Sequence, residues 1–460
     1  MENPIVLVVD DEPDVLKVIS MRLKSAGFNV ESVSSGKAAL EAISRNIPHV
    51  VVLDIYMPEM TGYEVLQKLR QNSQTVSLPV IMLSAGFSQE EKIKAFDLGA
   101  DDYIVKPYEE EEFIRRINAL AKRSTCQICK PALKNILITG GAGFIGSHLS
   151  KSLIAKGYNV FVLDDFSTGR KENVESLEGN KNFQLIRGSV TDEAILSKYI
   201  EQCDLIYHLA ATVGVKNVVD NPLDTVIYDT FGTGLVLKYA SAKGMKVVLT
   251  STSEVYGKST VVPFSEDNDL IMGPPNINRW SYACSKLLDE FLAIDYHKQR
   301  GLPVVVVRLF NVVGPGQVGM YGMVMPRFFK SAFKGTPITI YGDGEQVRCF
   351  TYIDDVVEIL MEFATSEKAN GEIVNLGSNN EISIKNLALK IKEITKSSSK
   401  IVFEPYSSYY GSQFQDIRKR VPDISKLKRI IGKSPKLGMD DILVKMHEYF
   451  LSHPDELDNI

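Results

Sequence analysis

Short apolar runs alternate with amphipathic stretches through the first 122 residues of the chain. The apolar runs are rich in β-branched residues and occupy residues 5–9, 50–53, 80–83 and 103–105. After the first run, Leu16, Ile19 and Leu23 recur at the spacing of one helix face. Strands that alternate with helices predict a parallel β-sheet with helices on both faces. We therefore expect residues 1–122 to form an α/β domain.

The same alternation resumes after a break. Polar residues and Pro131 interrupt the pattern at residues 123–133, which we interpret as a linker. Beyond it, apolar runs at residues 135–139, 160–163 and 304–309 predict strands of a second parallel sheet, and Ser147 opens a helical stretch. The sequence therefore predicts two α/β domains, residues 1–122 and residues 134–455.

The composition is that of an ordinary globular protein and argues against several classes. The 460 residues are 44% hydrophobic and 24% charged, which is typical of soluble chains with two or three domains. A net charge of −5 gives no reason to expect a nucleic-acid partner, since such domains carry a basic stripe. The first apolar run is short and meets acids at once, and no later segment is long enough to span a membrane. We expect a cytoplasmic protein with no membrane partner.

The cysteines do not suggest a disulfide framework. There are five, and they are scattered, which fits a reducing compartment. Cys126 and Cys129 have CxxC spacing, but two thiols supply only half of the ligands of a structural zinc site. We therefore interpret this pair as part of the linker.

Reactive side chains follow the strands of the first domain. Asp10 and Asp11 follow the first strand, and Asp54, Ser84 and Lys106 follow three later strands. The carboxyl ends of parallel strands meet at one edge of the sheet, so these side chains should form one site. Clustered carboxylates bind Mg²⁺, and we expect Asp10, Asp11 and Asp54 to do so. Asp54 is then the candidate nucleophile for a phosphoryl group, with Ser84 and Lys106 contacting its oxygens.

This arrangement resembles a response-regulator receiver domain over the whole of residues 1–122. The resemblance implies a flavodoxin-like fold, phosphorylation of Asp54, and a sensor histidine kinase or phosphotransfer protein as partner. It also implies that Tyr103 is the aromatic side chain that changes rotamer on phosphorylation. The alternative is that the acids are solvated strand ends, but five suitable residues at one sheet edge argue against it.

The second domain opens on a glycine-rich loop. Gly140, Gly143 and Gly146 follow the predicted strand and precede the helical stretch, with Phe144 and Ile145 between them. Such glycines allow a tight turn, a close approach of the backbone to a pyrophosphate, and close packing of helix on sheet. The helix N-terminus offers N–H groups to the phosphates. We therefore expect a dinucleotide to bind here.

Three further residues extend this predicted cofactor site. Asp164 ends the next strand, where a carboxylate can bind the ribose hydroxyls and repel a 2′-phosphate, which favours NAD over NADP. Asp192 follows the third strand, within reach of the adenine amino group. Ala210 follows the fourth strand, where a small side chain lets the backbone pass near the cofactor. We interpret His208, on that fourth strand, as a packed residue rather than a catalytic one.

Tyr282 and Lys286 are the candidate catalytic pair. Four residues apart on a helix, they share one face. A Tyr hydroxyl is a poor base at neutral pH, and we expect the Lys286 ammonium to lower its pKa. Thr252 ends the fifth strand and can hydrogen-bond the same substrate hydroxyl.

Together with the glycine loop, this pair resembles the extended short-chain dehydrogenase/reductase family that acts on nucleotide-sugars, over about residues 134–455. The resemblance implies a Rossmann-fold, doubly wound parallel sheet with a small C-terminal substrate-binding part, and a homodimer. It also implies oxidation of a sugar, most often a UDP-sugar, at C4. Tyr282 takes the proton and NAD⁺ takes the hydride. The 4-keto sugar is then epimerised, dehydrated or decarboxylated, and NAD⁺ is regenerated.

The triplet of residues 252–254 bears on which reaction follows. The sugar dehydratases carry an aspartate where this chain has Ser253, and a serine cannot serve as their acid. Ser253 and Glu254 resemble the triplet of UDP-glucuronate decarboxylases, with Arg348 as the matching arginine. A 4-epimerase stays open as an alternative, because epimerases also carry a basic residue at the position that matches Arg348. A non-catalytic module that binds NAD or a nucleotide-sugar is the alternative from another class.

The resemblance implies further substrate contacts in the C-terminal part. Asn311 follows the sixth strand, and in the family such loops hold the nucleotide and diphosphate. Arg348 and Arg420 offer planar guanidinium groups that bind two phosphate oxygens at once. Phosphorylation of Asp54 is then expected to bias the activity of the second domain.

Overall fold

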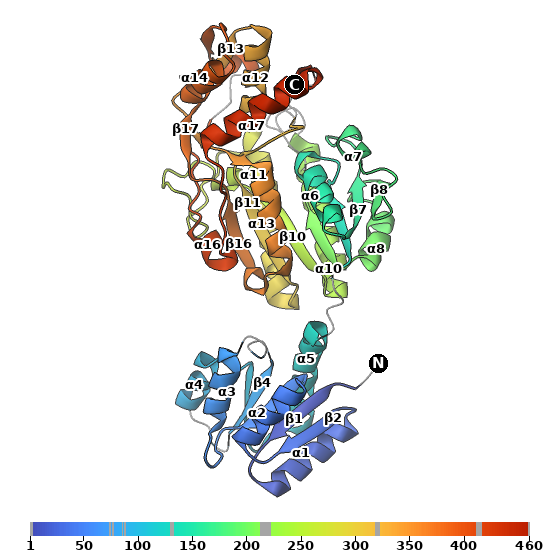
Figure 1. The fold of residues 1–460 in the computed structure, drawn as a ribbon. Helices are drawn as coiled ribbons and strands as arrows, with labels where there is room; N and C mark the ends of the chain where they lie inside the picture. The colour runs from blue at the N-terminus through green and yellow to red at the C-terminus, as the bar shows by residue number, and fades with distance from the viewer. Residues whose placement is uncertain are drawn as a thin grey trace. The chain divides into compact units, whose positions relative to one another are not determined.

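The computed structural model describes residues 3–72, 75, 78–84, 86, 89–128, 133–211, 222–317, 323–410 and 416–458. The chain divides into two compact units, residues 1–132 and residues 133–460 (Figure 1). Helix α5 runs from Glu110 to Ile128, so the first six residues of the segment that we expected to be a linker are helical. Cys129 lies outside the described residues. No helix in the described part of the chain is long and apolar enough to cross a membrane.

The first unit is a five-stranded parallel sheet in the order β2-β1-β3-β4-β5. Its strands are β1 (Ile5–Val9), β2 (Asn29–Val33), β3 (Val50–Asp54), β4 (Val80–Ser84) and β5 (Asp102–Val105). Its helices are α1 (Pro13–Ser25), α2 (Gly36–Arg45), α3 (Gly62–Gln71), α4 (Gln89–Asp97) and α5. This is the strand order of the flavodoxin-like fold, as predicted.

Alternating apolar residues build a core on each face of this sheet. Leu7 and Val9 pack with α2 and α3, whereas Val6 and Val8 pack with α1 and α5. Successive side chains of a strand point to opposite faces, so a fully apolar strand is buried on both sides. The helices begin where the sequence favours it: Pro13 opens α1, and Thr61 and Glu64 form a capping box on α3.

The second unit contains a seven-stranded parallel sheet in the order β8-β7-β6-β9-β10-β11-β16. Its strands are β6 (Asn135–Thr139), β7 (Asn159–Asp164), β8 (Phe183–Arg187), β9 (Leu205–His208), β10 (Lys246–Thr252), β11 (Val304–Leu309) and β16 (Glu372–Leu376). The connecting helices are α6 (Phe144–Ala155), α7 (Glu172–Glu175), α8 (Glu193–Gln202), α10 (Pro222–Lys243), α11 (Arg279–Arg300) and α13 (Ile353–Thr365), with 3₁₀ turns η1 (Ser253–Tyr256) and η3 (Glu367–Ala369). This doubly wound sheet is the predicted Rossmann-type fold.

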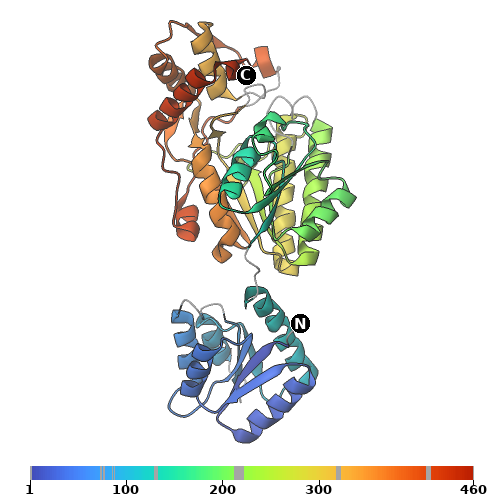
Figure 2. The ribbon, with the colours of Figure 1, turned by 45° about the vertical axis from the view of Figure 1, so that its right-hand side comes forward.

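Helices cover both faces of the large sheet, which Figure 2 shows from the side. Ile136 and Ile138 of β6 pack into the core that holds α6 and α13, whereas Leu137 between them packs into the core that holds α8, α10 and α11. Helix α6 begins at Phe144, three residues earlier than Ser147, because Gly143 in extended conformation already ends the loop.

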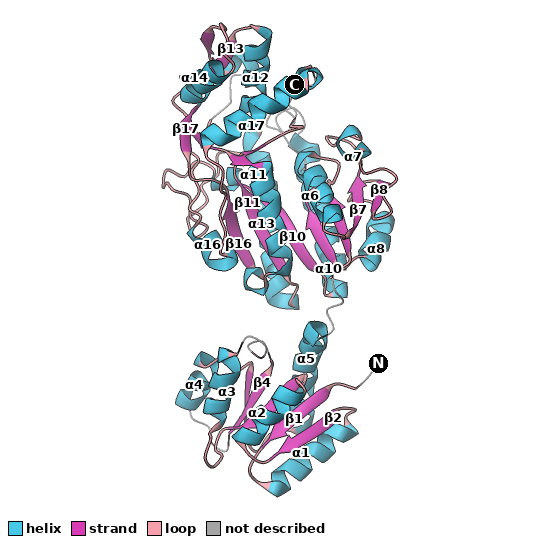
Figure 3. Ribbon diagram, viewed as in Figure 1, coloured by secondary structure: helices cyan, strands magenta, loops and turns pink. Residues whose placement is uncertain are grey.

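Shorter elements form the C-terminal part of this unit (Figure 3). They are β12 (Val312–Val313), β13 (Ile338–Tyr341), β14 (Val347–Cys349), β15 (Thr351–Tyr352), β17 (Glu381–Ser383) and β18 (Ile401–Glu404), with α12 (Val324–Lys334), α14 (Ile384–Ile394), α15 (Ser407–Tyr410), α16 (Ser425–Ile431), α17 (Met439–Ser452) and η4 (Pro454–Leu457). Strands β14 and β17 pair antiparallel, and β13 pairs parallel with β18. Phe328 of α12, Leu387 of α14 and Met446 of α17 belong to the same apolar core as α6 and α13, so this part packs directly on the large sheet.

Candidate active site and phosphoacceptor site

The glycine loop lies where the order of the large sheet reverses, between β6 and β9. Gly140 has φ +70°, and a Cβ on it would come within 2.7 Å of the Ala210 backbone nitrogen. A Cβ on Gly146 would come within 2.5 Å of the Gly140 carbonyl oxygen. Only glycine fits both positions, and the loop therefore turns tightly onto the N-terminus of α6.

A cavity of about 840 Å³ opens over the carboxyl ends of the strands. Its lining contains 14 of the 16 predicted cofactor, catalytic and substrate residues of this unit, namely Gly140, Gly143, Phe144, Ile145, Gly146, Asp164, Ala210, Thr252, Glu254, Tyr282, Lys286, Asn311, Arg348 and Arg420. The fold thus brings together residues that are far apart in the sequence. The backbone N–H groups of a glycine loop can bind a pyrophosphate, and a carboxylate can bind ribose hydroxyls. This combination therefore suits a dinucleotide.

Asp164 and Asp192, both predicted to contact the cofactor, have different environments. The buried Asp164 carboxylate accepts hydrogen bonds of 2.9 Å from the backbone of Ala142 and Phe166, and burial raises its pKa. Asp192 is exposed and does not line the cavity. Its carboxylate instead caps helix α8 by accepting 3.1 Å hydrogen bonds from the backbone at Ala194 and Ile195.

Ser253 is the other predicted residue outside the cavity lining. It is 2% exposed and opens the turn η1, directly after Thr252. Thr252 lines the cavity, where its side chain partly opposes the rise in the pKa of Tyr282. Thr252 therefore lines the cavity, whereas the side chain of the next residue, Ser253, is buried outside the cavity lining.

The environment of Tyr282 differs from the one that we expected. Burial raises the pKa of Tyr282 above its usual value, and the carboxylates of Asp229, Glu254 and Asp289 add to this effect. The Lys286 ammonium is engaged 2.9 Å from Asp289 in an ion pair that is almost fully buried. The pKa of Tyr282 is therefore raised in this structure, not lowered as expected, mainly because the side chain is buried and secondly because of the nearby carboxylates.

A buried network of charges surrounds Glu254. Arg279 donates three hydrogen bonds of 3.0–3.2 Å to the two Glu254 oxygens, and Arg420 donates a fourth of 2.5 Å. Burial alone would raise the pKa of Glu254, but the two guanidinium groups outweigh it and hold the pKa at about 2. Glu254 is therefore an anion at any working pH, and it can accept hydrogen bonds but cannot donate a proton.

Arg348 belongs to the same network through a different partner. Its guanidinium contacts both oxygens of Asp416, at 2.9 and 3.0 Å, and Asp416 also accepts a 3.1 Å bond from Arg279. Burial and the neighbouring Arg420 lower the pKa of Arg348 to about 10. Among the described residues, the arginines that donate hydrogen bonds to Glu254 are Arg279 and Arg420.

Arg279, Asp289 and Asp416 are site residues that the sequence reasoning did not single out. Arg279 stands three residues before Tyr282, which places it on the same helix face one turn earlier. That spacing was a usable signal. Asp289 stands three residues after Lys286 on the same helix and could have been found in the same way. No spacing links Asp416 to the site, because it lies 137 residues from Arg279.

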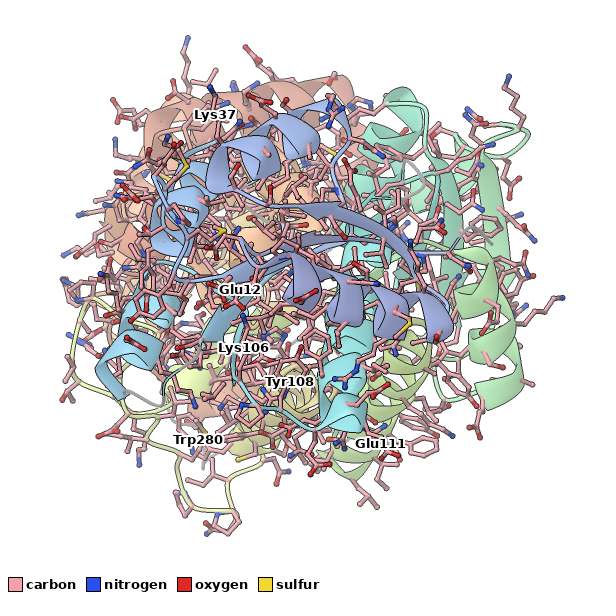
Figure 4. The ribbon with its side chains drawn as sticks, turned by 90° about the horizontal axis from the view of Figure 1, so that it is seen from below. Glu12, Lys37, Lys106, Tyr108, Glu111 and Trp280 are labelled. Atoms are coloured by element: carbon pink, nitrogen blue, oxygen red, sulfur yellow. The ribbon has the colours of Figure 1, made fainter. Side chains whose placement is uncertain are left out.

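The phosphoacceptor site lies at the carboxyl edge of the five-stranded sheet. The Lys106 ammonium lies 2.7 Å from Asp10 and 2.6 Å from Asp54. The backbone of Glu12 donates a 3.0 Å hydrogen bond to Asp10, so Glu12 and Lys106, both labelled in Figure 4, contact the same carboxylate. Burial raises the pKa of Asp54, although Lys106 opposes the shift. Asp10, Asp54 and Lys106 thus meet as the sequence predicted.

Ser84 and Tyr103 both contact helix α4. The Ser84 hydroxyl lies 3.0 Å from the Gly86 carbonyl and 3.3 Å from the Glu91 carboxylate. The buried Tyr103 side chain points its hydroxyl to the same carboxylate, at 3.4 Å. Glu91 of α4 therefore links the predicted phosphate-contacting hydroxyl to the predicted switch aromatic.

The predicted Mg²⁺ ligands are only partly assembled. Asp10 and Asp54 converge on Lys106, and Asp11 is half-buried beside Asp10. Oxygen donors of this kind suit Mg²⁺. In the part of the chain that is described, however, no three acidic, His or Cys side chains are grouped as a metal would need. Mg²⁺ binding therefore stays a prediction.

Two family models match the chain, one in each unit. Residues 6–118 match the response regulator receiver domain, and residues 137–446 match the model described as GDP-mannose 4,6 dehydratase. The fold, the glycine loop and the Tyr282–Lys286 pair define the second unit as a short-chain dehydrogenase/reductase. The chain belongs to the extended, NAD-dependent nucleotide-sugar branch of that family and carries a response-regulator receiver domain at its N-terminal end.

Similar proteins include decarboxylases and epimerases. A UDP-N-acetyl-alpha-D-glucosaminuronate decarboxylase from Bacillus cytotoxicus is 42% identical over 318 residues, which cover 69% of this chain and 98% of the relative. UDP-glucuronic acid decarboxylase 1 from Xenopus tropicalis is 39% identical and is matched over 69% of this chain and 72% of its own length. The structure of UDP-glucuronic acid 4-epimerase from Bacillus cereus, in complex with UDP-glucuronic acid and NAD, has 32% identity and a TM-score of 0.63, and the match covers 69% of this chain and 99% of that one.

Proposed function

We propose that this protein is an NAD-dependent decarboxylase of a UDP-linked uronic acid, with a receiver domain as its regulator. The observation that carries the proposal is the buried Glu254 anion, bound by two arginines in the same cavity as Tyr282 and Lys286. Both curated relatives named above are decarboxylases, which supports the choice over 4-epimerisation.

Different residues of the cavity have different roles in such a reaction. NAD⁺, when bound at the glycine loop, supplies the hydride acceptor for C4 of the sugar and a positive charge that opposes the acids near Tyr282. Tyr282 takes the proton of the C4 hydroxyl and returns it in the last step, while Thr252 orients that hydroxyl. With C4 as a ketone, the bond from C5 to the carboxylate breaks. CO₂ leaves, the electron pair moves to the C4 oxygen, and C5 takes up one proton from water. The hydride then returns to C4 together with the Tyr282 proton, which restores the C4 hydroxyl and regenerates NAD⁺. Arg348 and Arg420 bind anionic groups of the substrate.

The sugar is either a 2-acetamido uronate or glucuronate itself. The 42% identity with the N-acetylglucosaminuronate decarboxylase, over nearly the whole relative, favours the 2-acetamido sugar. The test is to incubate the purified protein with UDP-glucuronate, UDP-N-acetylglucosaminuronate and UDP-glucose, and to weigh the products by mass spectrometry. Loss of the mass of CO₂ supports the proposal. An unchanged mass at a new retention time identifies an epimerase, and no product beside tight NAD binding identifies a binding module.

The receiver domain is proposed to accept a phosphoryl group on Asp54 from a histidine kinase or phosphotransfer protein, with Mg²⁺ held by Asp10, Asp11 and Asp54. The ion would neutralise charge on the incoming phosphoryl group. Treatment with acetyl phosphate and Mg²⁺ should add one phosphoryl group to the wild type and none to Asp54→Asn. Equal turnover before and after that treatment would argue against regulation through Asp54.

We further propose a homodimer through helices α10 and α11, which pack against each other. An apolar stripe runs along them, made of Leu223, Ile227 and Phe231 on α10 and Leu288 and Phe291 on α11, with exposures of 46–70%. A stripe this large on a soluble protein marks an association site, and two such helix pairs can form a four-helix bundle. Phe231→Glu should convert the dimer to a monomer in light scattering, whereas Leu451→Glu, at an exposed apolar residue of α17, should not.

A further inference from the structure

Arg279 has a more constrained position than any other cation of the charge network around Glu254. Its side chain is 4% exposed, against 7% for Arg348 and 12% for Arg420. Its Nε and Nη2 atoms donate to the Glu254 carboxylate, and its Nη1 atom donates to Asp416. All three nitrogens of the guanidinium group are therefore engaged with carboxylates, which is the geometry in which arginine best fixes orientation.

The two cations that contact Glu254 come from different parts of the fold. Arg279 is the first residue of α11, the helix that also carries Tyr282 and Lys286. Arg420 comes from the C-terminal segment that follows Asp416, and its Nε is buried with no hydrogen-bond partner among the described residues. Arg420 thus retains a free donor for an anionic ligand, whereas Arg279 is committed to the protein.

We propose that Arg279 is a positioning residue of this site: it fixes the orientation and the charge of the Glu254 carboxylate, and through Asp416 it holds the segment that carries Arg420 against the cavity. The expected effect on kcat rests on the proposed decarboxylase function. The positioning of Glu254 and of the Arg420 segment does not depend on that function. Because α11 carries both Arg279 and Tyr282, this one helix positions the catalytic Tyr282 and, through Arg279, the Glu254 carboxylate.

The guanidinium groups around Glu254 keep its carboxylate ionised. A carboxylate with only Tyr282 and Asp416 as further neighbours would be buried beside another acid, and it would take up a proton as the pH falls. The guanidinium groups of Arg279, Arg420 and Arg348 oppose this. Without Arg279, Arg420 must neutralise Glu254 and is less available for the substrate.

The experiment compares Arg279→Met, Arg279→Lys and the control Arg418→Met in the full chain. Arg418 forms an exposed ion pair with Asp343 and lies close in sequence to both Asp416 and Arg420. We expect Arg279→Met to lower kcat by roughly 100-fold, as for a misplaced catalytic group, and to add an acidic limb to the pH profile of kcat. Arg279→Lys should remove that limb while restoring only part of kcat, because one ammonium cannot hold both oxygens. Arg418→Met should match the wild type.

Binding of UDP, measured by calorimetry, reports whether the cavity is intact. UDP binding that is weakened but retained, as expected when Arg420 is less available, supports the positioning role if the new acidic limb is also present. Two outcomes overturn it: a pH profile of Arg279→Met that parallels the wild type, or equal losses in the Met and Lys variants together with loss of UDP binding, which indicate a structural role only.

A second measurement separates this inference from the proposed function. In protein labelled with carbon-13 at the glutamate carboxyls, the Glu254 signal is assigned by its loss in Glu254→Gln. Its titration midpoint should rise in Arg279→Met relative to the wild type, with no substrate present. If the wild type decarboxylates nothing but this midpoint rises, the proposed function fails and the role of Arg279 stands. If the midpoint does not move, the role of Arg279 is wrong for any reaction.

Discussion

The ion pair between Lys286 and Asp289 is the contact on which the geometry of the catalytic lysine depends. The two side chains are 2% and 0% exposed, and their charged atoms are 2.9 Å apart. Burial would lower the pKa of Lys286, but Asp289 and Asp229 raise it above its usual value. In Asp289→Asn, the lysine keeps a polar neighbour but loses its nearest negative charge.

The expected cost follows from the burial of the pair. Removing one partner of a buried ion pair costs about 3–5 kcal/mol, and the remaining charge of Asp229 favours the lower end, about 3 kcal/mol. For a unit of residues 133–460, an unfolding entropy of about 2.1 cal/mol/K per residue gives roughly 0.7 kcal/mol/K. The melting temperature of this unit should therefore fall by about 4 °C.

Differential scanning calorimetry measures this shift, with Asp295→Asn as the matched control. Asp295 is an exposed acid on the same helix, and its substitution should change the melting temperature by less than about 1 °C. Asp289→Asn should also weaken NAD binding, because the ammonium is no longer held in one orientation. A melting temperature equal to that of the control would refute the reasoning, since Lys286 would then not depend on Asp289.

Three further predictions follow from the same structure. Gly146→Ala should weaken NAD binding at least tenfold in fluorescence titrations, because the added Cβ would lie 2.5 Å from the Gly140 carbonyl; wild-type affinity would contradict this. Tyr282→Phe should abolish turnover but leave NAD binding within about threefold, and residual turnover above about 1% would assign the proton transfer elsewhere. Burial and the nearby Lys286 lower the pKa of His208 to about 3, so the unfolded chain takes up a proton that the native state does not. Stability in urea should therefore be complete above pH about 6.5 and fall as the pH drops towards 3, and His208→Gln should flatten this slope.

Much of the fold follows from local pattern. The predicted strands at residues 5–9, 135–139 and 304–309 match β1, β6 and β11 at both ends. Apolar β-branched runs bounded by glycine and acidic residues leave little freedom in placing a buried parallel strand. The glycine loop and the Tyr282–Lys286 spacing are equally local, because a turn and one helix turn fix their geometry. The start of the linker was harder to predict, since α5 continues through polar residues to Ile128.

The sequence did not predict which groups the charged side chains contact. Asp192 has the right place in the sequence for a cofactor contact, yet its carboxylate caps α8, since a helix N-terminus competes for any nearby acid. Arg348 pairs with Asp416, and Arg420 reaches Glu254 across 166 residues of sequence. Which of several arginines meets which acid depends on how the C-terminal segment folds back over the cavity.

The sequence by itself determined the two α/β units, the strand ends that carry reactive side chains, and the pairs that one helix turn brings together. Periodicity and short spacings encode these features, and they act over a few residues. Only the tertiary structure decided the charge state of the site. Guanidinium groups hold Glu254 as an anion against the effect of its burial, whereas burial, assisted by nearby carboxylates, holds Tyr282 as a protonated phenol. Several of those charges, such as Asp416 and Arg420, come from a segment that no local pattern connects to the helix of Tyr282.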